Sequence, residues 1–295
     1  MSSLEDAADL LRSAAAESRR VRIGDDLDTS GLDRILEHET GDLTCTVEAG
    51  IRLSALNAAL GRHGQRLSLD PPGDPTIGAC LAKNLSGPLR HRWGSPRDLV
   101  LGVTLVLADG TIANAGGKVV KNVAGYDLGK LVCGSLGRLA LIARVSLRLH
   151  PVPAATATVV AETDDAAAVV AGLLRSQLVP SAVDVLHPRR VAVRFEGSEA
   201  AVLAQTDAAR SLLEGEQTGD DVWDEARRRQ GGALGRVRFA PGELDRLLAE
   251  LAEAVVRPCA GIAYVPHTVP DETPVAVQAL QERVRERFDP AGMLA

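Results

Sequence analysis

The chain has 295 residues, of which 45% are hydrophobic and 24% are charged, and its formal net charge is −6. This length is typical of two domains with buried cores, and the composition excludes a wholly disordered or coiled-coil protein. Aromatic residues make up only 2% of the chain, which excludes a protein that stacks the bases of single-stranded nucleic acid. The negative charge argues against a broad phosphate-binding face, so we expect no nucleic-acid partner.

The four cysteines lie far apart in the sequence, at Cys45, Cys80, Cys133 and Cys259. No pair has the spacing of a zinc or iron–sulfur site, so we expect buried free thiols and no metal. The segment 1–20 carries acidic side chains and no long apolar run, unlike a signal peptide. No stretch approaches the ~20 apolar residues of a membrane helix, and we therefore expect a cytoplasmic protein.

Hydrophobic periodicity and turn residues predict the elements of the first half of the chain. They are a helix over 3–19, strands over 20–23 and 43–48, a helix over 53–63, an extended loop over 68–75, and strands over 99–108 and 139–149. Asp109 and Gly110 are typical of a hairpin turn, with a return strand over 111–115. The run His150-Pro151-Val152-Pro153 ends the last of these strands, and we predict a domain boundary there.

The second half of the chain has the pattern of strands joined by helices and one hairpin. Strands are predicted over 156–162, 182–187, 190–195, 233–239 and 261–265, and helices over 164–177, 199–214, 242–256 and 273–287. Residues 215–232 form a charged, glycine-containing stretch without a predicted element. This order favours an α+β sheet covered by helices on one face.

Three glycine-containing clusters lie over 70–79, 84–95 and 116–137. Glycine permits positive φ and a close backbone approach, and a loop that presents bare N–H groups can hold a phosphate or the edge of a carbonyl-rich ring. Three such loops, separated by strands, point to a large planar cofactor that carries phosphate; the alternative is that these glycines only serve tight turns. The chain has neither the GxxxxGK[ST] of a P-loop nor a GxGxxG after its first strand.

The same region resembles a known family. Residues 116–142 read GGKVVKNVAGYDLGKLVCGSLGRLALI, and residues 70–110 read DPPGDPTIGACLAKNLSGPLRHRWGSPRDLVLGVTLVLADG. Together with LTCTVEAGIRLSALNAALGRHGQRL over 43–67, they resemble the FAD-binding subunit of bacterial glycolate oxidase, within the wider vanillyl-alcohol-oxidase type of FAD domain. The last residues, RVRERFDPAGMLA over 283–295, resemble the ending of that family.

The resemblance implies an α+β fold: a two-subdomain FAD-binding domain of the vanillyl-alcohol-oxidase type over 1–153, then a smaller α+β cap domain over 154–295 with a C-terminal helix. FAD would lie between the subdomains, with its ring toward the cap. The implied cofactor-binding residues fall into three groups: Pro72, Thr76, Ile77 and Gly78 along the pyrophosphate and ring; Asn84, Ser86, Gly87 and Gly94 on the flavin side; and Gly125, Tyr126, Gly137 and Ile142 closing the other side. Tyr126 and Asp127 are alternatively buttresses of their loop.

The chain departs from the family pattern in four places. The family's first FAD loop has three glycines, but Arg22-Ile23 is followed only by Gly24-Asp25-Asp26, whose carboxylates would repel a diphosphate. The usual Gly-Gly pair is Gly78-Ala79, and Gly137 is followed by Arg-Leu-Ala, with Ala140 where the family usually has Gly. A final Pro-Gly-Arg is missing.

The implied activity is the oxidation of a 2-hydroxy acid to a 2-oxo acid by a complex with a larger flavin subunit and an iron–sulfur subunit. Hydride transfer to the flavin would be the chemistry of the cofactor, with the protein supplying position and electrostatics. Two alternatives stay open: a degenerate structural subunit of such a complex that does not hold flavin, and a small-molecule or anion-binding module without a redox role. The visible spectrum of the protein after incubation with FAD separates a working FAD subunit from the degenerate subunit, and flavin that is reduced by a 2-hydroxy acid would exclude the binding module.

No catalytic residue follows from the sequence. His91 and His267 lie near the predicted flavin edge and in the cap, where ordinary solvated histidines are the simpler explanation. Arg90, Arg92 and Arg97 have the chemistry to bind a substrate carboxylate, and Lys118 and Lys121 stand out because the chain has few lysines. Since no general base emerges, we expect the larger flavin subunit to carry substrate oxidation.

Overall fold

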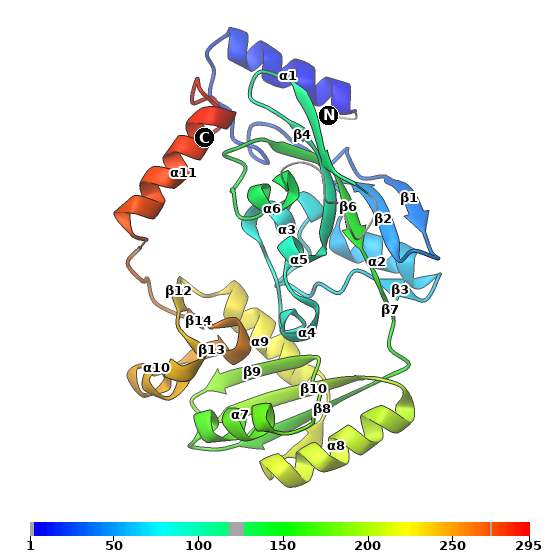
Figure 1. Ribbon diagram of the computed structural model, residues 1–295, viewed down its shortest axis with the longest axis vertical. Helices are drawn as coiled ribbons and strands as arrows, with labels where there is room; N and C mark the ends of the chain where they lie inside the picture. Colours follow the sequence, from blue (N-terminus) through cyan, green and yellow to red (C-terminus); the bar gives the residue numbers. More distant parts are fainter. Residues whose placement is uncertain (1–2, 118–126, 272) are drawn as a thin grey trace.

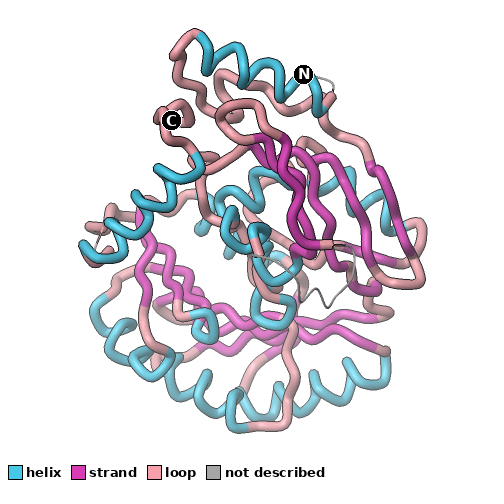
Figure 2. Tube along the Cα trace, turned by 45° about the horizontal axis from the view of Figure 1, so that its top comes forward, coloured by secondary structure: helices cyan, strands magenta, loops and turns pink. Residues whose placement is uncertain are grey.

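The computed structural model describes residues 3–117, 127–271 and 273–295, and within them the chain forms two lobes (Figure 1). The first lobe is built on a five-stranded sheet with the order β1-β2-β6-β4-β5, and the second on a seven-stranded sheet with the order β11-β8-β10-β9-β13-β14-β12. All neighbouring strands in these two sheets are antiparallel. Helices cover the second sheet on both sides (Figure 2).

The first sheet buries one of its faces. Its strands are β1 (Ile35–Glu39), β2 (Thr44–Glu48), β4 (Val100–Val106), β5 (Ile112–Gly116) and β6 (Leu141–Arg148). The helices that pack on the buried face are α2 (Leu53–Gly61), α3 (Ile77–Lys83) and α6 (Leu128–Val132). Side chains alternate along the strands: Val47 and Val145 lie in the core, whereas Thr46 and Ser146 hydrogen-bond to each other (2.9 Å) on the opposite face. The first lobe also contains the short elements α4 (Arg90–Trp93), α5 (Pro96–Leu99), β3 (Gln65–Arg66) and β7 (His150–Pro151).

The two ends of the chain meet in the first lobe. Helix α1 (Leu4–Ala16) begins at a capping box of Ser3 and Asp6 and packs in one cluster with Met293 and Leu294. The backbone N–H of Val21 donates to the carbonyl of Met293 (2.8 Å). Helix α11 (Val275–Phe288) runs along one side of the molecule from the second lobe back to the first (Figure 1). The last residues therefore pack with the first lobe, and the division of the chain at 153 stays a prediction.

The second lobe has helices on both faces of its sheet. Its strands are β8 (Ala155–Glu162), β9 (Ala182–His187), β10 (Arg190–Gly197), β11 (Glu216–Thr218), β12 (Gly235–Arg238), β13 (Ala254–Arg257) and β14 (Ile262–Val265), and its helices are α7 (Ala166–Arg175), α8 (Glu199–Leu213), α9 (Asp221–Gly231) and α10 (Leu244–Glu250). Helices α7, α8 and α10 bury their apolar residues on one face. Helix α9 packs Trp223 and Ala226 on the other. The prediction of helices on one face only was therefore wrong.

Most predicted elements are present with shifted ends, and three stretches differ from the prediction. The stretch 215–232 contains β11 and α9, and the predicted helix over 242–256 is the shorter α10 followed by β13. The predicted strand over 20–23 is reduced to isolated bridges at Val21 and Ile23. Tertiary pairing decided β13, because its β-branched pair Val255-Val256 lies between β9 and β14. Among the described residues, no helix is long and apolar enough to span a membrane.

Candidate cofactor site

A hollow of about 280 Å³, which we call the cradle, lies in the first lobe between the loop that follows Val21, helix α3 and the start of β6. Four of the residues predicted from the sequence line it: Thr76, Gly78, Gly137 and Ile142. Ligand pockets usually occupy about 300–1,000 Å³, so the cradle by itself has room for part of a dinucleotide. The structure thus brings together residues that are more than 60 positions apart in the sequence.

Glycine and alanine are seven of the 15 residues that line the cradle. Gly24 and Gly137 have φ values of 94° and 79°, a region that favours glycine. Gly78 lets α3 approach the first sheet, because a Cβ at this position would lie 3.1 Å from the carbonyl oxygen of Ala49. Ala79, which departs from the family's Gly-Gly pair, lines the cradle with its methyl group. The wall therefore exposes backbone and small side chains to a ligand.

The charges at the cradle are partly balanced within the chain. Asp25 lines the cradle, but one of its carboxylate oxygens lies 3.8 Å from the Arg22 guanidinium. Asp26 accepts a hydrogen bond from the backbone N–H of Arg22 (2.9 Å), which holds the pKa of that carboxyl below its usual range. Lys83, from the last turn of α3, adds an ammonium group to the lining. The expected repulsion of a diphosphate is thus reduced by Arg22 and Lys83.

The backbone amides at the start of α3 already have partners. The N–H groups of Ile77 and Gly78 donate to the carbonyls of Ile51 (2.9 Å) and Ala49 (2.6 Å). The N–H of Ala79 donates to the hydroxyl of Thr76 (3.2 Å), the N-cap residue. Gly78 therefore allows α3 to pack closely against Ala49, and its N–H group is not free to bind a ligand.

A second hollow of about 590 Å³ adjoins the cradle, because Leu136 lines both. It lies between the loop after α6 and helix α11, with Ser135 on one wall and Arg285 on the other. Asn84, the left-handed C-cap of α3, approaches this loop at Gly134. The Asn84 Oδ1 and Ser135 Oγ atoms are buried, and neither has a hydrogen-bond partner among the described residues.

These observations fit a bound dinucleotide. Buried polar atoms nearly always have partners in folded proteins, so Asn84 Oδ1 and Ser135 Oγ are suited to polar groups of a ligand. The cradle and the adjoining hollow together form an extended site. Its charged lining residues are two acids, Asp25 and Glu282, and three bases, Lys83, Arg138 and Arg285. No group of three or more metal-ligating side chains is gathered anywhere in the described part of the chain.

The other predicted site residues lie away from the cradle lining. Gly87 is packed against Asp70, because a Cβ there would lie 1.8 Å from the Asp70 carbonyl oxygen, and Gly94 is packed against the Asp98 side chain. Ile77 is fully buried in the core, and Pro72 contacts Gly231 of the second lobe.

The backbone carbonyl of Ser86 accepts hydrogen bonds from Gln230 and Arg257 of the second lobe. Gly125 and Tyr126 lie outside the described residues. The sequence missed Ala49, Ala82 and Lys83, although the spacing of 79, 82 and 83 is that of one helix face.

The candidate catalytic residues are not gathered at the cradle. His91 lies in a hollow against Leu173 and Val179 of the second lobe, and burial lowers the pKa of its imidazole. The Arg90 guanidinium donates to the Ser86 hydroxyl (3.3 Å). Lys118 and Lys121 lie outside the described residues.

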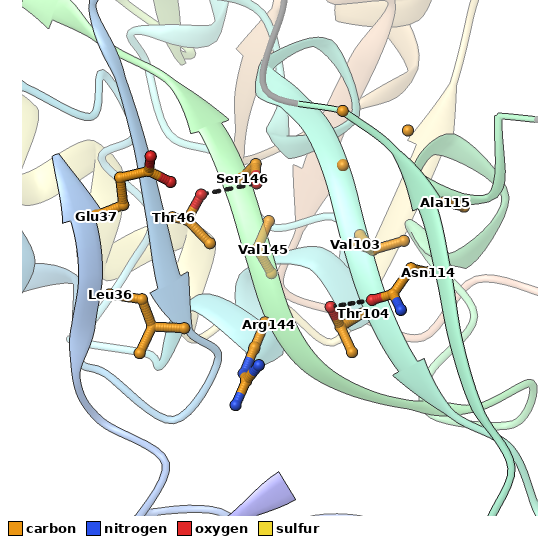
Figure 3. A pocket seen from close by; sticks show the side chains of 13 residues that line it. Leu36, Glu37, Thr46, Val103, Thr104, Asn114, Ala115, Arg144, Val145 and Ser146 are labelled. Atoms are coloured by element: carbon orange, nitrogen blue, oxygen red, sulfur yellow. Dashed lines mark hydrogen bonds between the residues drawn. The ribbon is translucent and has the colours of Figure 1, made fainter. Parts of the chain in front are cut away.

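A further hollow of about 570 Å³ lies on the polar outer face of the first sheet (Figure 3). Its polar side chains include two mutually bonded pairs, Thr46 with Ser146 and Thr104 with Asn114. None of the ten predicted cofactor residues that the structure describes lines it. An antiparallel sheet commonly leaves one face to solvent, so this hollow needs no ligand to explain it.

An FAD-binding domain match covers part of the first lobe, including the start of α3 at the cradle. Residues 26–116 match the family model described as FAD binding domain. Over 99% of its length the chain has the fold of a solved alkyldihydroxyacetonephosphate synthase, with a TM-score of 0.76, 16% sequence identity and coverage of 74% of that chain. The predicted α+β fold with an FAD-binding domain is confirmed.

Three curated relatives show which FAD-dependent proteins the chain is similar to. The chain is 34% identical over 212 residues to glycolate oxidase subunit GlcE of Escherichia coli (strain K12), covering 70% of this chain and 59% of GlcE. It is 33% identical over 160 residues to glycolate oxidase subunit GlcD of Bacillus subtilis (strain 168), covering 52% of this chain and 34% of GlcD. A third relative is D-lactate dehydrogenase [cytochrome] 1, mitochondrial, of Saccharomyces cerevisiae, which is 32% identical over 171 residues, or 56% of this chain and 29% of that protein.

These findings confirm the predicted resemblance to the FAD-binding subunit of glycolate oxidase. They also indicate FAD as the cofactor. The chain spans less than two thirds of each of these relatives. Activity, substrate and partners of this chain are therefore matters of proposal.

Proposed function

We propose that this chain is an FAD-binding oxidoreductase subunit that takes part in the oxidation of a 2-hydroxy acid to a 2-oxo acid. The observation that carries the proposal is the cradle, because Thr76, Gly78, Gly137 and Ile142 meet there. The FAD-binding match over 26–116 includes the first two of these residues. The names of the relatives, glycolate oxidase subunits and a D-lactate dehydrogenase, support the substrate class. The division into an FAD-binding part over 1–153 and a cap over 154–295 belongs to the same proposal.

In this proposal the residues of the chain position the cofactor and shield it. When bound, flavin would supply a two-electron acceptor within the complex. The glycine and alanine wall gives close backbone contact, and Lys83 provides a positive charge for phosphate. Ser135 lines the adjoining hollow, and Asn84 Oδ1 and Ser135 Oγ are buried acceptors without a partner among the described residues. No described side chain at the cradle has the role of a general base, so substrate oxidation is assigned to a partner subunit.

The partners that we propose are a larger flavin subunit and an iron–sulfur subunit. Two relatives are named as subunits of glycolate oxidase, which supports assembly into a complex. The iron–sulfur partner and the cytoplasmic location rest on the sequence resemblance and composition. Affinity purification from the native cell, with the absorbance of the co-purified proteins, tests both partners, and cell fractionation tests the location.

FAD titration with a cradle-blocking variant tests the cofactor site. The wild-type protein is expected to quench added FAD fluorescence and to show a flavin absorption band after gel filtration. Ala79→Phe places a ring in the cradle and is expected to abolish both signals, whereas Ala55→Phe, on the exposed side of α2, is expected to retain them. A wild-type protein that stays colourless after incubation with FAD refutes the proposal.

A second candidate function is a structural subunit that does not hold flavin. The observation in its favour is that the amides of Ile77, Gly78 and Ala79 already donate within the chain. The short loop at Gly24 also contributes an acid, Asp25, to the lining. This candidate predicts a colourless protein that still co-purifies with the larger flavin subunit.

A further inference from the structure

The second lobe holds one backbone carbonyl of the first lobe with two side chains. The carbonyl oxygen of Ser86 accepts hydrogen bonds from Gln230 Nε2 (2.9 Å) and Arg257 Nη1 (3.3 Å). Gln230 lies at the end of α9 and Arg257 at the end of β13. All three residues are buried, with exposed fractions of 2%, 9% and 3% for Ser86, Gln230 and Arg257. The contact is therefore shielded from solvent. Hydrogen bonds in the protein interior are electrostatically stronger than those in water.

The Arg257 guanidinium is fixed by further contacts on its other sides. Its Nη2 donates to Gln230 Oε1 (2.7 Å), and its Nη1 also donates to the Tyr264 hydroxyl (3.2 Å). Its Nε lies 3.4 Å from Asp184 Oδ1, and Asp184 is completely buried. A guanidinium is planar and carries five N–H donors in a fixed arrangement. These contacts leave its Nη1 aimed at Ser86 in one orientation.

The segment 84–89 is held from the opposite side by Asp70 of the first lobe. The Leu89 N–H donates to Asp70 Oδ1 (3.0 Å), and Gly87 packs so tightly that a Cβ would lie 1.8 Å from the Asp70 carbonyl oxygen. Arg227 of α9 lies 3.6 Å from Asp70 Oδ2. The segment has no helix or strand of its own. Beyond the backbone bonds of Asn84 and Leu85 to the end of α3, contacts from both lobes hold it.

We propose that Arg257 is the positioning residue through which the second lobe fixes segment 84–89, and with it the Asn84 side of the cofactor site. The proposal rests on the proposed function, because Asn84 follows α3 directly and its Oδ1 atom is the buried, unpartnered acceptor described above. Flavin binding in the first lobe and packing of the second lobe are then coupled through one carbonyl group. Without Arg257 and Gln230 the Ser86 carbonyl would stay buried but lose both of its donors from the second lobe, which costs folding free energy.

Hydrogen exchange and FAD titration of Arg257→Lys test the proposal. Lysine keeps a positive charge near Asp184 but cannot form the planar set of contacts with Ser86, Gln230 and Tyr264. We expect amides of 84–89 to exchange about tenfold faster, and FAD to bind about tenfold more weakly, as for the loss of one hydrogen bond to a charged donor. The matched control is Arg66→Lys, which alters another contact between the lobes, the Arg66–Glu196 ion pair (2.6 Å). In the control both quantities are expected to stay within about twofold of wild type.

A second variant guards against misfolding. Asp184→Asn combined with Arg257→Gln removes both buried charges together, and so avoids an uncompensated charge. Exchange over 84–89 that stays at the wild-type rate in both Arg257 variants overturns the proposal. So does an equal acceleration in Arg66→Lys, because the effect would then be general loosening of the lobes. A wild-type protein that binds no FAD refutes the proposed function, while exchange without FAD still decides whether Arg257 positions the segment.

Discussion

Removal of the Glu196 carboxylate is expected to loosen the contact between the two lobes. Glu196 lies in β10, and its side chain is only 2% exposed. Its two oxygens accept from the Arg66 guanidinium at 3.1 Å and 2.6 Å, and Oε2 also accepts from Trp93 Nε1 at 3.2 Å. Arg194 approaches it to 3.7 Å. Glu196→Ala therefore leaves two arginines and one indole N–H without this acceptor.

The size of the effect follows from burial. Removing one partner of a buried ion pair costs about 3–5 kcal/mol, because the remaining charge is left without compensation. The Arg66 side chain is 18% exposed. Because solvent screens part of its charge, we expect a cost at the lower end of that range, about 3 kcal/mol. The lost indole hydrogen bond adds about 1 kcal/mol. We expect the free energy of unfolding to fall by about 4 kcal/mol.

Urea unfolding followed by tryptophan fluorescence and far-UV circular dichroism measures this loss. A slope of about 3 kcal/mol per molar urea converts the expected loss into a midpoint shift of about 1 M. The control is Asp9→Ala, which removes an ion pair with Arg12 whose side chains are 71% and 61% exposed. That change should cost less than about 1 kcal/mol. Equal midpoint shifts in the two variants would refute the argument that burial strengthens the Glu196 contact.

Three further predictions concern packing and pH. Gly87→Ala would place a Cβ 1.8 Å from the Asp70 carbonyl oxygen, whereas the Gly41 site has open space; thermal unfolding should show a loss of about 3 kcal/mol for Gly87→Ala and almost none for Gly41→Ala. Burial raises the pKa of Asp70 from 3.8 to about 7, so its contribution to stability is complete below pH 3.8 and is lost as the pH rises to 7. In Asp70→Asn the free energy of unfolding, measured with urea, should no longer fall by this contribution between pH 3.8 and 7. A variant with the same pH dependence as wild type would contradict the prediction. Burial lowers the pKa of His150 from 6.5 to about 4, so its contribution is complete above pH 6.5 and is lost as the pH falls to 4. The same titration of His150→Gln should show a shallower loss on the acid side, the opposite sign to Asp70→Asn; a loss as steep as in wild type would refute this assignment.

The sequence predicted elements well where local pattern and tertiary environment agree. Strand β2 alternates and is rich in Thr and Val, and helix α8 buries Val202, Ala209 and Leu213 at helical spacing. Helix α9 was missed because most of its residues are charged or polar, and only Val222, Trp223 and Ala226 mark its buried side. With so few apolar residues, the sequence of α9 does not show the apolar stripe that predicts an amphipathic helix. The buried side of α9 is recognised only from the sheet against which it packs.

The sequence predicted only part of the candidate site. Thr76, Gly78, Gly137 and Ile142 meet at the cradle, as the family resemblance implied that they would share a cofactor. Gly87 and Gly94 have other causes, since each is packed against an aspartate. A glycine in a sequence does not say whether its missing side chain makes room for a ligand or for another part of the chain.

The amino-acid sequence by itself determined the class of this protein: an α+β chain whose first half carries the pattern of an FAD-binding domain. Local periodicity was sufficient for the α+β class, because it is a property of neighbouring positions. The FAD-binding domain was implied by the resemblance of residues within 43–142 to a known family. The tertiary structure decided which residues form the cradle, that α9 covers the second face of its sheet, and that Arg257 reaches Ser86. These contacts join residues up to 171 positions apart, and such pairs are fixed only when the two lobes pack together.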